Sequence, residues 1–174
     1  MINETIAQHL LQIKAIKLNP TNPFTWSSGL KAPIYCDNRK SLSYPTTRNI
    51  VKKGFLQLIE AQYSDAEVIA AVATGAIAMG AVIADALNKP LVYIRPKAKS
   101  HGLQNRIEGE VREGQRVVVI EDLISTGNSS LAAVDVLREK NCKVLGMAAI
   151  FTYGLSVAAE NFENKQCKLY TLCD

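Results

Sequence analysis

Residues 117–130, VVVIEDLISTGNSS, join a run of apolar β-forming residues to the start of an expected helix. Between the two lie adjacent carboxylates, Glu121 and Asp122, and a short turn rich in hydroxyl groups. In open α/β sheets, ligands bind beyond the carboxyl ends of the strands, where the following helix begins. This stretch therefore predicts a buried strand, a ligand-binding turn and a helix in direct succession.

The turn that follows the carboxylates suits an anion. The first turn of a helix offers unpaired N–H groups and the positive end of the helix dipole, which together bind phosphate. Ser125, Thr126 and Ser129 add hydroxyl donors, and Gly127 allows close approach of the backbone. The two carboxylates would repel that phosphate, so we expect them to hold hydroxyl groups or a cation on the same ligand. A sugar phosphate meets both demands.

A simpler interpretation is that Asp122 and Ser125 serve only as turn and capping residues, a common role for these types. Two acids directly after VVVI at a strand end favour the ligand-binding interpretation. The stretch is not a Walker phosphate loop, because no lysine follows Gly127 and the G-x-x-x-x-G-K-[ST] spacing is missing.

Helical and strand patterns alternate on both sides of this stretch. We expect a helix before Asn19-Pro20, since apolar residues recur at helical spacing from Ile6 to Ile16. Further helices are expected at 46–62, 77–87, 129–140 and 155–163, and strands at 68–72, 91–94, 116–120, 144–151 and 168–172. Short apolar strands alternating with helices are typical of an α/β fold with a mostly parallel central sheet and flanking helices.

Composition narrows the class of protein. A chain of 174 residues is the size of one domain, so we expect a single domain over residues 1–174. The net charge of +4 is spread out and forms no lysine–arginine block, so nucleic acid is not expected as the main partner. The apolar run at 68–87 is interrupted by Gly75, Gly80 and Asp85, which favours a strand, a turn and a buried helix over a membrane span.

The cysteines and the N-terminus indicate a cytoplasmic protein. The N-terminal stretch has an acidic start and no cleavage-like segment, so it is not read as a signal peptide. The four cysteines show neither a C-x-x-C pair nor histidines at metal-binding spacing; they are Cys36, Cys142, Cys167 and Cys173. We expect free, reduced thiols rather than a redox or zinc site.

Two stretches break the alternation. Residues 20–45 hold four prolines and several turn residues, which predicts a hood of short pieces that, with the first helix, occupies about residues 1–45. Residues 95–115 are long, polar and aperiodic, and a loop of that length in a compact α/β domain is typical of a mobile lid. A solvated charged excursion is the alternative for the second stretch.

Four stretches together carry a family resemblance. The segment at 117–130 resembles the phosphoribosyl-pyrophosphate (PRPP) signature of the type I phosphoribosyltransferases. FTWSSGLKAPIYCDNR (24–39), VATGAIAMGAVIADAL (72–87) and YIRPKAKSHGLQNRIEGEV (93–111) are similar to the shorter bacterial form of the orotate phosphoribosyltransferases. The resemblance implies the type I phosphoribosyltransferase fold. It also implies transfer of a phosphoribosyl group from PRPP to orotate, giving orotidine 5′-monophosphate and pyrophosphate in pyrimidine synthesis.

The resemblance also implies site residues. The catalytic residues would be Lys99, His101 and Asp122. PRPP would be bound by Arg95, Lys99, His101, Glu121, Asp122, Leu123, Ile124, Ser125, Thr126, Gly127, Asn128 and Ser129. Orotate would be flanked by Lys31, Tyr35, Cys36 and Ser125, although ordinary packing of the hood is an equal alternative for Tyr35 and Trp26. Cations on the lid would neutralise the departing pyrophosphate.

The same resemblance implies cofactor and assembly. Mg²⁺ would be bound mainly through PRPP and pyrophosphate oxygens, without a dedicated protein metal site. The expected partners are the substrates PRPP and orotate and a second copy of the chain, in a homodimer whose lid closes over the other subunit's site. A phosphoribosyltransferase for another base and a non-catalytic PRPP-binding regulator remain alternatives.

Four features depart from the family pattern. Asn128 replaces the usual second glycine of the phosphate turn, and because asparagine tolerates positive φ we expect weaker pre-organisation rather than loss. Ser100 stands where the family carries an acid and Gln104 where it has glycine, which bears on lid mobility and proton relay. The chain ends at CKLYTLCD, where members usually continue with another helix, so we expect a truncated or naturally short form.

Overall fold

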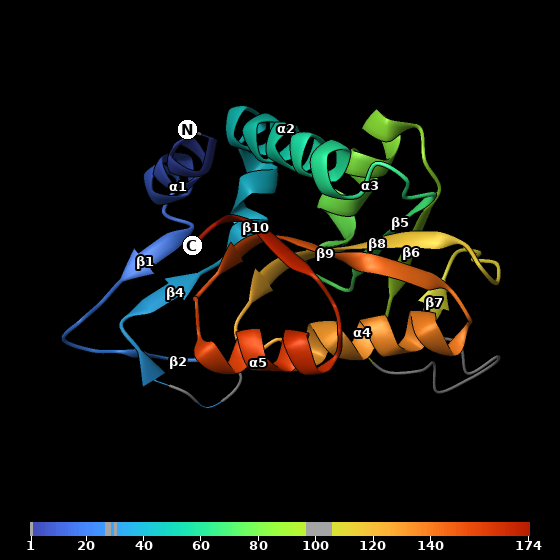
Figure 1. The fold of residues 1–174 in the computed structure, drawn as a ribbon. Coiled ribbons are helices and arrows are strands. Elements are labelled where there is room, and N and C mark those ends of the chain that lie inside the picture. The colour runs from blue at the N-terminus through green and yellow to red at the C-terminus, as the bar shows by residue number, and fades with distance from the viewer. Residues whose placement is uncertain (1, 27–28, 30, 97–105) are drawn as a thin grey trace.

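The computed structural model describes residues 2–26, 29, 31–96 and 106–174. Within these residues the centre is a six-stranded sheet in the order β10-β9-β8-β5-β6-β7 (Figure 1). Its strands are β5 (Val68–Val72), β6 (Leu91–Ile94), β7 (Ile107–Glu108), β8 (Arg116–Ile124), β9 (Lys143–Thr152) and β10 (Leu169–Cys173). Neighbouring strands are parallel except β7, which pairs antiparallel with β6 at the edge. The expected α/β class with a mostly parallel sheet is confirmed.

Helices cover both faces of the sheet (Figure 1). One face carries α1 (Ile2–Gln12), α2 (Pro45–Gln62) and α3 (Ile77–Leu87), and the other carries α4 (Asn128–Glu139) and α5 (Ser156–Asn164). Strand β8 shows why its sequence is apolar without alternation. Val118 and Ile120 pack into the core beneath the first set of helices, whereas Val117 and Val119 pack into the core against α4 and α5.

The hood consists of short pieces, as expected. Strand β1 (Ile16–Leu18) pairs antiparallel with β4 (Ile34–Cys36), and β2 (Phe24–Thr25) pairs with β3 (Lys31–Ala32). A 3₁₀ helix, η1 (Asn38–Ser43), then leads into α2. The Trp26 ring stacks on Tyr153 with centroids 3.9 Å apart, which ties the hood to the end of β9.

The first helix is shorter than predicted. It ends at Gln12, not near Asn19, and Ile16 belongs to β1. Lys14 adopts a left-handed conformation with φ of 55°, and the Ala15 N–H donates to the Leu10 carbonyl. This turn ends the helix because it redirects the chain into the hood, and helical spacing alone does not show that redirection.

The remaining boundaries differ in two places that bear on function. Strand β8 continues to Ile124, so both carboxylates lie within its last residues rather than after it. The predicted loop at 95–115 contains β7, and only its part at 97–105 lies outside the described residues. No helix in the described chain is long and apolar enough to cross a membrane.

Candidate active site

A cleft of about 1000 Å³ opens at the carboxyl ends of β5, β6 and β8. Its lining comes from the hood, the segment after β5, the two ends of the lid, the turn between β8 and α4, and the residue after β9. It comprises Trp26, Tyr35, Cys36, Asp37, Arg39, Val72, Ala73, Thr74, Gly75, Ile94, Arg95, Pro96, Arg106, Glu121, Asp122, Leu123, Ser125, Thr126, Gly127, Asn128, Ser129, Ser130, Ala133, Tyr153 and Val157. Segments far apart in sequence therefore meet where an α/β sheet binds its ligands.

The two adjacent carboxylates occupy different environments. Glu121 is 6% exposed; its Oε2 accepts a hydrogen bond from the Ser130 hydroxyl at 2.7 Å, and its Oε1 accepts one from the Asp122 N–H at 2.9 Å. Asp122 is half-buried, and its carboxylate lies over Gly75. A Cβ atom at Gly75 would lie 2.3 Å from Asp122 Oδ2, so only glycine permits this approach.

The turn at 125–129 is shaped by Gly127. This residue caps α4 with φ of 81°, and a Cβ atom there would lie 2.7 Å from the Phe162 ring. The Asn161 amide of α5 donates to the Thr126 carbonyl at 2.9 Å and to Asn128 Oδ1 at 3.2 Å. Asn128 itself is helical, so the positive φ that we considered for it falls on Gly127 instead. The N–H groups of the first turn of α4 thus face the cleft in a braced turn.

The described ends of the lid are joined to each other. The Arg95 N–H donates to the Arg106 carbonyl at 2.8 Å, and the Arg106 Nε–H donates to the Arg95 carbonyl at 3.2 Å. The Arg95 guanidinium also forms an ion pair with Glu108 at 3.4 Å. Both arginines line the cleft and bring positive charge to it. Lys99 and His101 lie outside the described residues.

Comparison with known proteins decides the family. The phosphoribosyl transferase domain matches residues 45–170. The orotate phosphoribosyltransferase of Porphyromonas gingivalis is 54% identical over 173 residues, covering 99% of this chain and 82% of that protein. The same enzyme of Bacteroides thetaiotaomicron is 57% identical, covering 98% of this chain and 81% of that protein. The chain belongs to the orotate phosphoribosyltransferase family. The crystal structure of the Aeropyrum pernix orotate phosphoribosyltransferase superposes with a TM-score of 0.85 at 28% identity, covering 97% of this chain and 92% of that one.

The residues that family resemblance associates with orotate are not all at the cleft. Tyr35, Cys36 and Ser125 line it. Lys31 is exposed in β3, outside the residues that line the cleft in the described structure. Ile124, expected near PRPP, has a fully buried side chain, so only its main chain is available to a ligand.

Burial sets the protonation of the site. It raises the pKa of Glu121 well above 4.5, and the neighbouring Asp122 charge raises it further. Burial raises the pKa of the Cys36 thiol to about 12 and that of the Tyr153 phenol to about 12. The thiol and the phenol therefore stay protonated at neutral pH and act as neutral hydrogen-bonding groups.

Three positions beside the site were not found from the sequence of this family member. Asn38 and Ser130 are almost fully buried and bond the two carboxylate residues, and Asn161 bonds the turn at 125–129. Ser130 lies within the stretch at 117–130 and Asn38 within the stretch at 24–39, so both belong to motifs that the sequence already singles out. Their partners lie on other elements, 9, 84 and 35 residues away in the sequence, and polar residues of this kind give no periodic signal.

Proposed function

We propose that the chain catalyses transfer of the 5-phosphoribosyl group from PRPP to orotate. The bond between the anomeric carbon and the pyrophosphate oxygen breaks, a bond from that carbon to a ring nitrogen of orotate forms, and pyrophosphate leaves. One observation carries the proposal: a half-buried carboxylate at the end of β8 stands beside a glycine-capped helix N-terminus in one cleft, in a member of this family.

The acid pair and the turn bind opposite ends of the phosphoribosyl group. The N–H groups and hydroxyls of residues 125–129 hold the 5′-phosphate, because a helix N-terminus favours an anion. Asp122 accepts hydrogen bonds from the ribose hydroxyls and stabilises positive charge that develops at the anomeric carbon. Glu121 accepts hydrogen bonds from the Asp122 N–H and from the Ser130 hydroxyl, and so supports the Asp122 main chain.

Cations hold the pyrophosphate. Arg95 and Arg106 line the cleft at the base of the lid, and their charges neutralise negative charge that grows on the departing group. We assign Lys99 and His101 to the same task from family resemblance, with Lys99 assisting departure.

Orotate binds between the hood and the turn. Tyr35 and Cys36 from β4 and Ser125 from the turn flank that part of the cleft. The flat ring of orotate fits the aromatic wall that Trp26 and Tyr153 extend. Lys31 lies outside the residues that line the cleft in the described structure, so its role rests on resemblance alone.

The site's donors suit a Mg²⁺ ion that arrives with PRPP. No group of three histidine, cysteine, aspartate or glutamate residues gathers to hold a metal anywhere in the described part of the chain. Asp122 is the carboxylate that would hold such an ion against the sugar, while phosphate oxygens supply its other ligands. When bound, the ion neutralises charge on the diphosphate.

Organisation beyond the site also follows the family. We assign residues 1–174 to a single phosphoribosyltransferase domain, acting as a homodimer in which each lid serves the partner's cleft. A cytoplasmic location stays a prediction.

The deciding experiment is incubation with orotate, PRPP and Mg²⁺, with orotate consumption and formation of orotidine 5′-monophosphate as readouts. Hypoxanthine and uracil replace orotate as controls. Turnover of orotate alone supports the proposal. Turnover of another base would assign a different phosphoribosyltransferase, and PRPP binding without any turnover would assign a regulator.

A further inference from the structure

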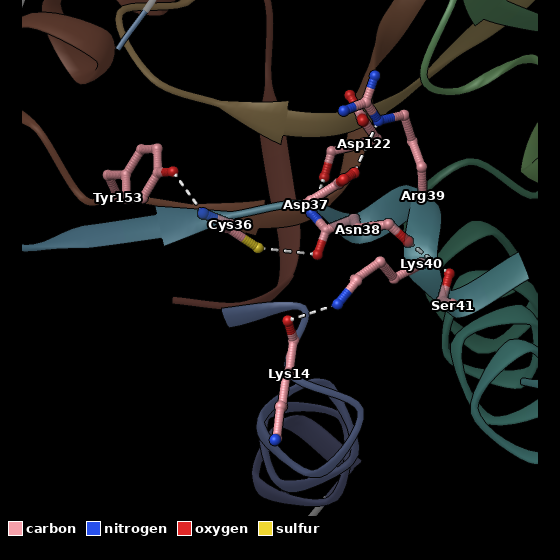
Figure 2. Close-up of polar contacts among 9 residues, drawn as sticks. All are labelled: Lys14, Cys36, Asp37, Asn38, Arg39, Lys40, Ser41, Asp122 and Tyr153. Atoms are coloured by element: carbon pink, nitrogen blue, oxygen red, sulfur yellow. Dashed lines mark hydrogen bonds and ion pairs between the residues drawn. The ribbon is translucent and has the colours of Figure 1, made fainter. Parts of the chain in front are cut away.

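A buried asparagine joins the hood to the strand that carries the acid pair. Asn38, the first residue of η1, is 1% exposed, and its Nδ2 donates to the main-chain carbonyl of Asp122 at 2.5 Å (Figure 2). Its Oδ1 accepts a hydrogen bond from the Cys36 thiol at 3.0 Å. The two bonds use both ends of one amide and connect residues that are 84 positions apart in the chain.

The orientation of this amide follows from its partners. A main-chain carbonyl only accepts hydrogen bonds, so the NH₂ end must face Asp122. The carbonyl end then faces Cys36, whose thiol remains a donor because burial raises its pKa to about 12. Flipping the amide would place two acceptors together at Asp122, which fixes the side chain in one arrangement.

The Asp122 carbonyl lies on a part of β8 where strand β5 no longer supplies a hydrogen-bond donor. Strand β8 pairs with β5 as far as Ile120, opposite Ala71, and then continues to Ile124. Asp122 therefore stands beyond the paired part of β5, where Asn38 donates in place of a neighbouring strand. A buried carbonyl without such a partner would be strongly unfavourable.

Two further hydrogen bonds stabilise the hood segment that carries Asn38. The Ser41 hydroxyl donates to the Asn38 carbonyl at 2.6 Å within η1, and the Cys36 N–H donates to Tyr153 Oη at 3.0 Å (Figure 2). Ser41 is also 1% exposed. Both bonds stabilise the hood segment around Asn38, but neither of them involves the amide of its side chain.

We propose that Asn38 is a positioning residue, which fixes the Asp122 main chain and so aims the Asp122 carboxylate at the ribose. The inference rests on the proposed function, because it assigns Asp122 the role given there. Small misplacements of a catalytic group have large kinetic cost. Through the contact between Asn38 and Asp122, the hood would take part in catalysis as well as forming one wall of the base site.

The test compares Asn38→Ala and Asn38→Asp with Ser41→Ala as the matched control. Asn38→Asp keeps the side-chain volume but sets a carboxylate oxygen against the Asp122 carbonyl. Ser41→Ala removes a buried hydrogen bond of the same 3₁₀ helix and leaves both bonds of the Asn38 amide in place. For each variant we would measure kcat, KM for PRPP, the melting temperature, and amide hydrogen exchange of a peptide that contains residues 121–126.

We expect Asn38→Ala to lower kcat by about tenfold to a hundredfold. KM for PRPP stays unchanged because the phosphate turn is braced elsewhere. Hydrogen exchange in the 121–126 peptide of Asn38→Ala is faster than in wild type, and Asn38→Asp loses more activity than Asn38→Ala. Ser41→Ala has a lower melting temperature than wild type but the same kcat. Should Asn38→Ala fail to fold, the Asn38→Asp comparison decides the question.

Normal kcat in the Asn38 variants, or an equal loss of kcat in Ser41→Ala, would overturn the proposal. A wild-type protein that does not convert orotate would refute the proposed function instead. The exchange comparison then still decides whether Asn38 fixes the Asp122 main chain, since it requires no turnover.

Discussion

Glu121 and Asp122 are neighbours in the chain but have opposite surroundings. Both residues line the cleft, but Glu121 is buried and both of its carboxylate oxygens accept hydrogen bonds from within the protein, whereas Asp122 is half-buried. Sites that use two carboxyl groups commonly separate their tasks by such differences in environment. We therefore assign direct contact with the sugar to Asp122 and support of the strand end to Glu121.

Asp122→Asn tests this division. The variant should lose about a hundredfold or more in kcat, because the amide cannot stabilise positive charge in the transition state. It should still be stabilised by ribose 5-phosphate, since the turn at 125–129 holds the phosphate. Thermal-shift titrations of wild type and variant with ribose 5-phosphate provide the measurement. Complete loss of that stabilisation in the variant would show that the division is wrong.

Glu121→Gln tests whether the pKa of the buried Glu121 carboxyl is raised, through the pH dependence of the free energy of unfolding. In the unfolded chain the carboxyl ionises near 4.5, but burial raises its pKa in the folded protein. Between these pKa values the folded state binds more protons than the unfolded state, so stability falls as pH rises. Glutamine does not titrate; its carbonyl can keep the hydrogen bond from the Asp122 N–H, and its NH₂ group can donate to the Ser130 hydroxyl oxygen.

The expected result is that the stability of Glu121→Gln, relative to wild type, increases from pH 5 to pH 8. Urea denaturation across that range measures it. Two stability profiles that run parallel would mean that Glu121 is ionised in the folded protein.

At the scale of elements, the spacing of apolar residues predicted those helices and strands whose burial leaves a clear local pattern. The expected strand at 68–72 and helix at 77–87 coincide with β5 and α3, because a continuously buried strand and a buried helix leave clear apolar patterns. The two-residue strand β7 was missed, since two residues carry no period. The end of α1 was misplaced because Ile16 continues the helical spacing although it packs as part of β1.

From local pattern alone, only the part of the cleft that comes from one contiguous stretch of sequence could be predicted. The acids and the turn form one contiguous stretch, so their proximity is local. Asn38 and Asn161 approach that stretch from elements far away in sequence, and only the folded topology shows their partners. Asn128 was expected to weaken the turn, but its side chain accepts a hydrogen bond from Asn161.

Asn161 of helix α5 bonds the turn at 125–129, and Asn161→Ala tests whether this bond supports the proposed binding of phosphate. Loss of the bonds to Thr126 and Asn128 should raise KM for PRPP by about fivefold, the equivalent of roughly 1 kcal/mol for one hydrogen bond. The kcat should change little, because Asp122 keeps its own support. Steady-state kinetics with varied PRPP measures both constants.

Asn164→Ala is the matched control, since Asn164 is exposed on the same helix. It should leave KM for PRPP unchanged. An equal rise of KM in both variants would mean that α5 acts through general stability rather than through the turn.

At the scale of the whole molecule, a shared site makes a quantitative prediction. If Lys99 acts across the dimer and Asp122 within its own subunit, a dimer of Lys99→Ala with Asp122→Asn has one doubly altered site and one intact site. Random exchange of equal amounts makes half the dimers hybrid, so about a quarter of all sites should recover full activity. Activity after co-expression or co-refolding is the measurement.

Each variant alone, treated in the same way, is the control and should remain nearly inactive. Absence of recovery in dimers confirmed as hybrid would mean that each lid serves its own subunit.

Because β6 and β7 pair as a hairpin at the edge of the sheet, folding of the sheet depends little on the lid between them. Ile94 pairs with Ile107, and Arg95 bonds Arg106, so the chain leaves and re-enters the sheet at adjacent points. The entropy of closing a loop grows only slowly with its length. The sequence between these points can therefore be lengthened, shortened or exchanged with little effect on the scaffold. We therefore expect that exchange of the segment between Arg95 and Arg106 changes activity but leaves the stability of the sheet intact.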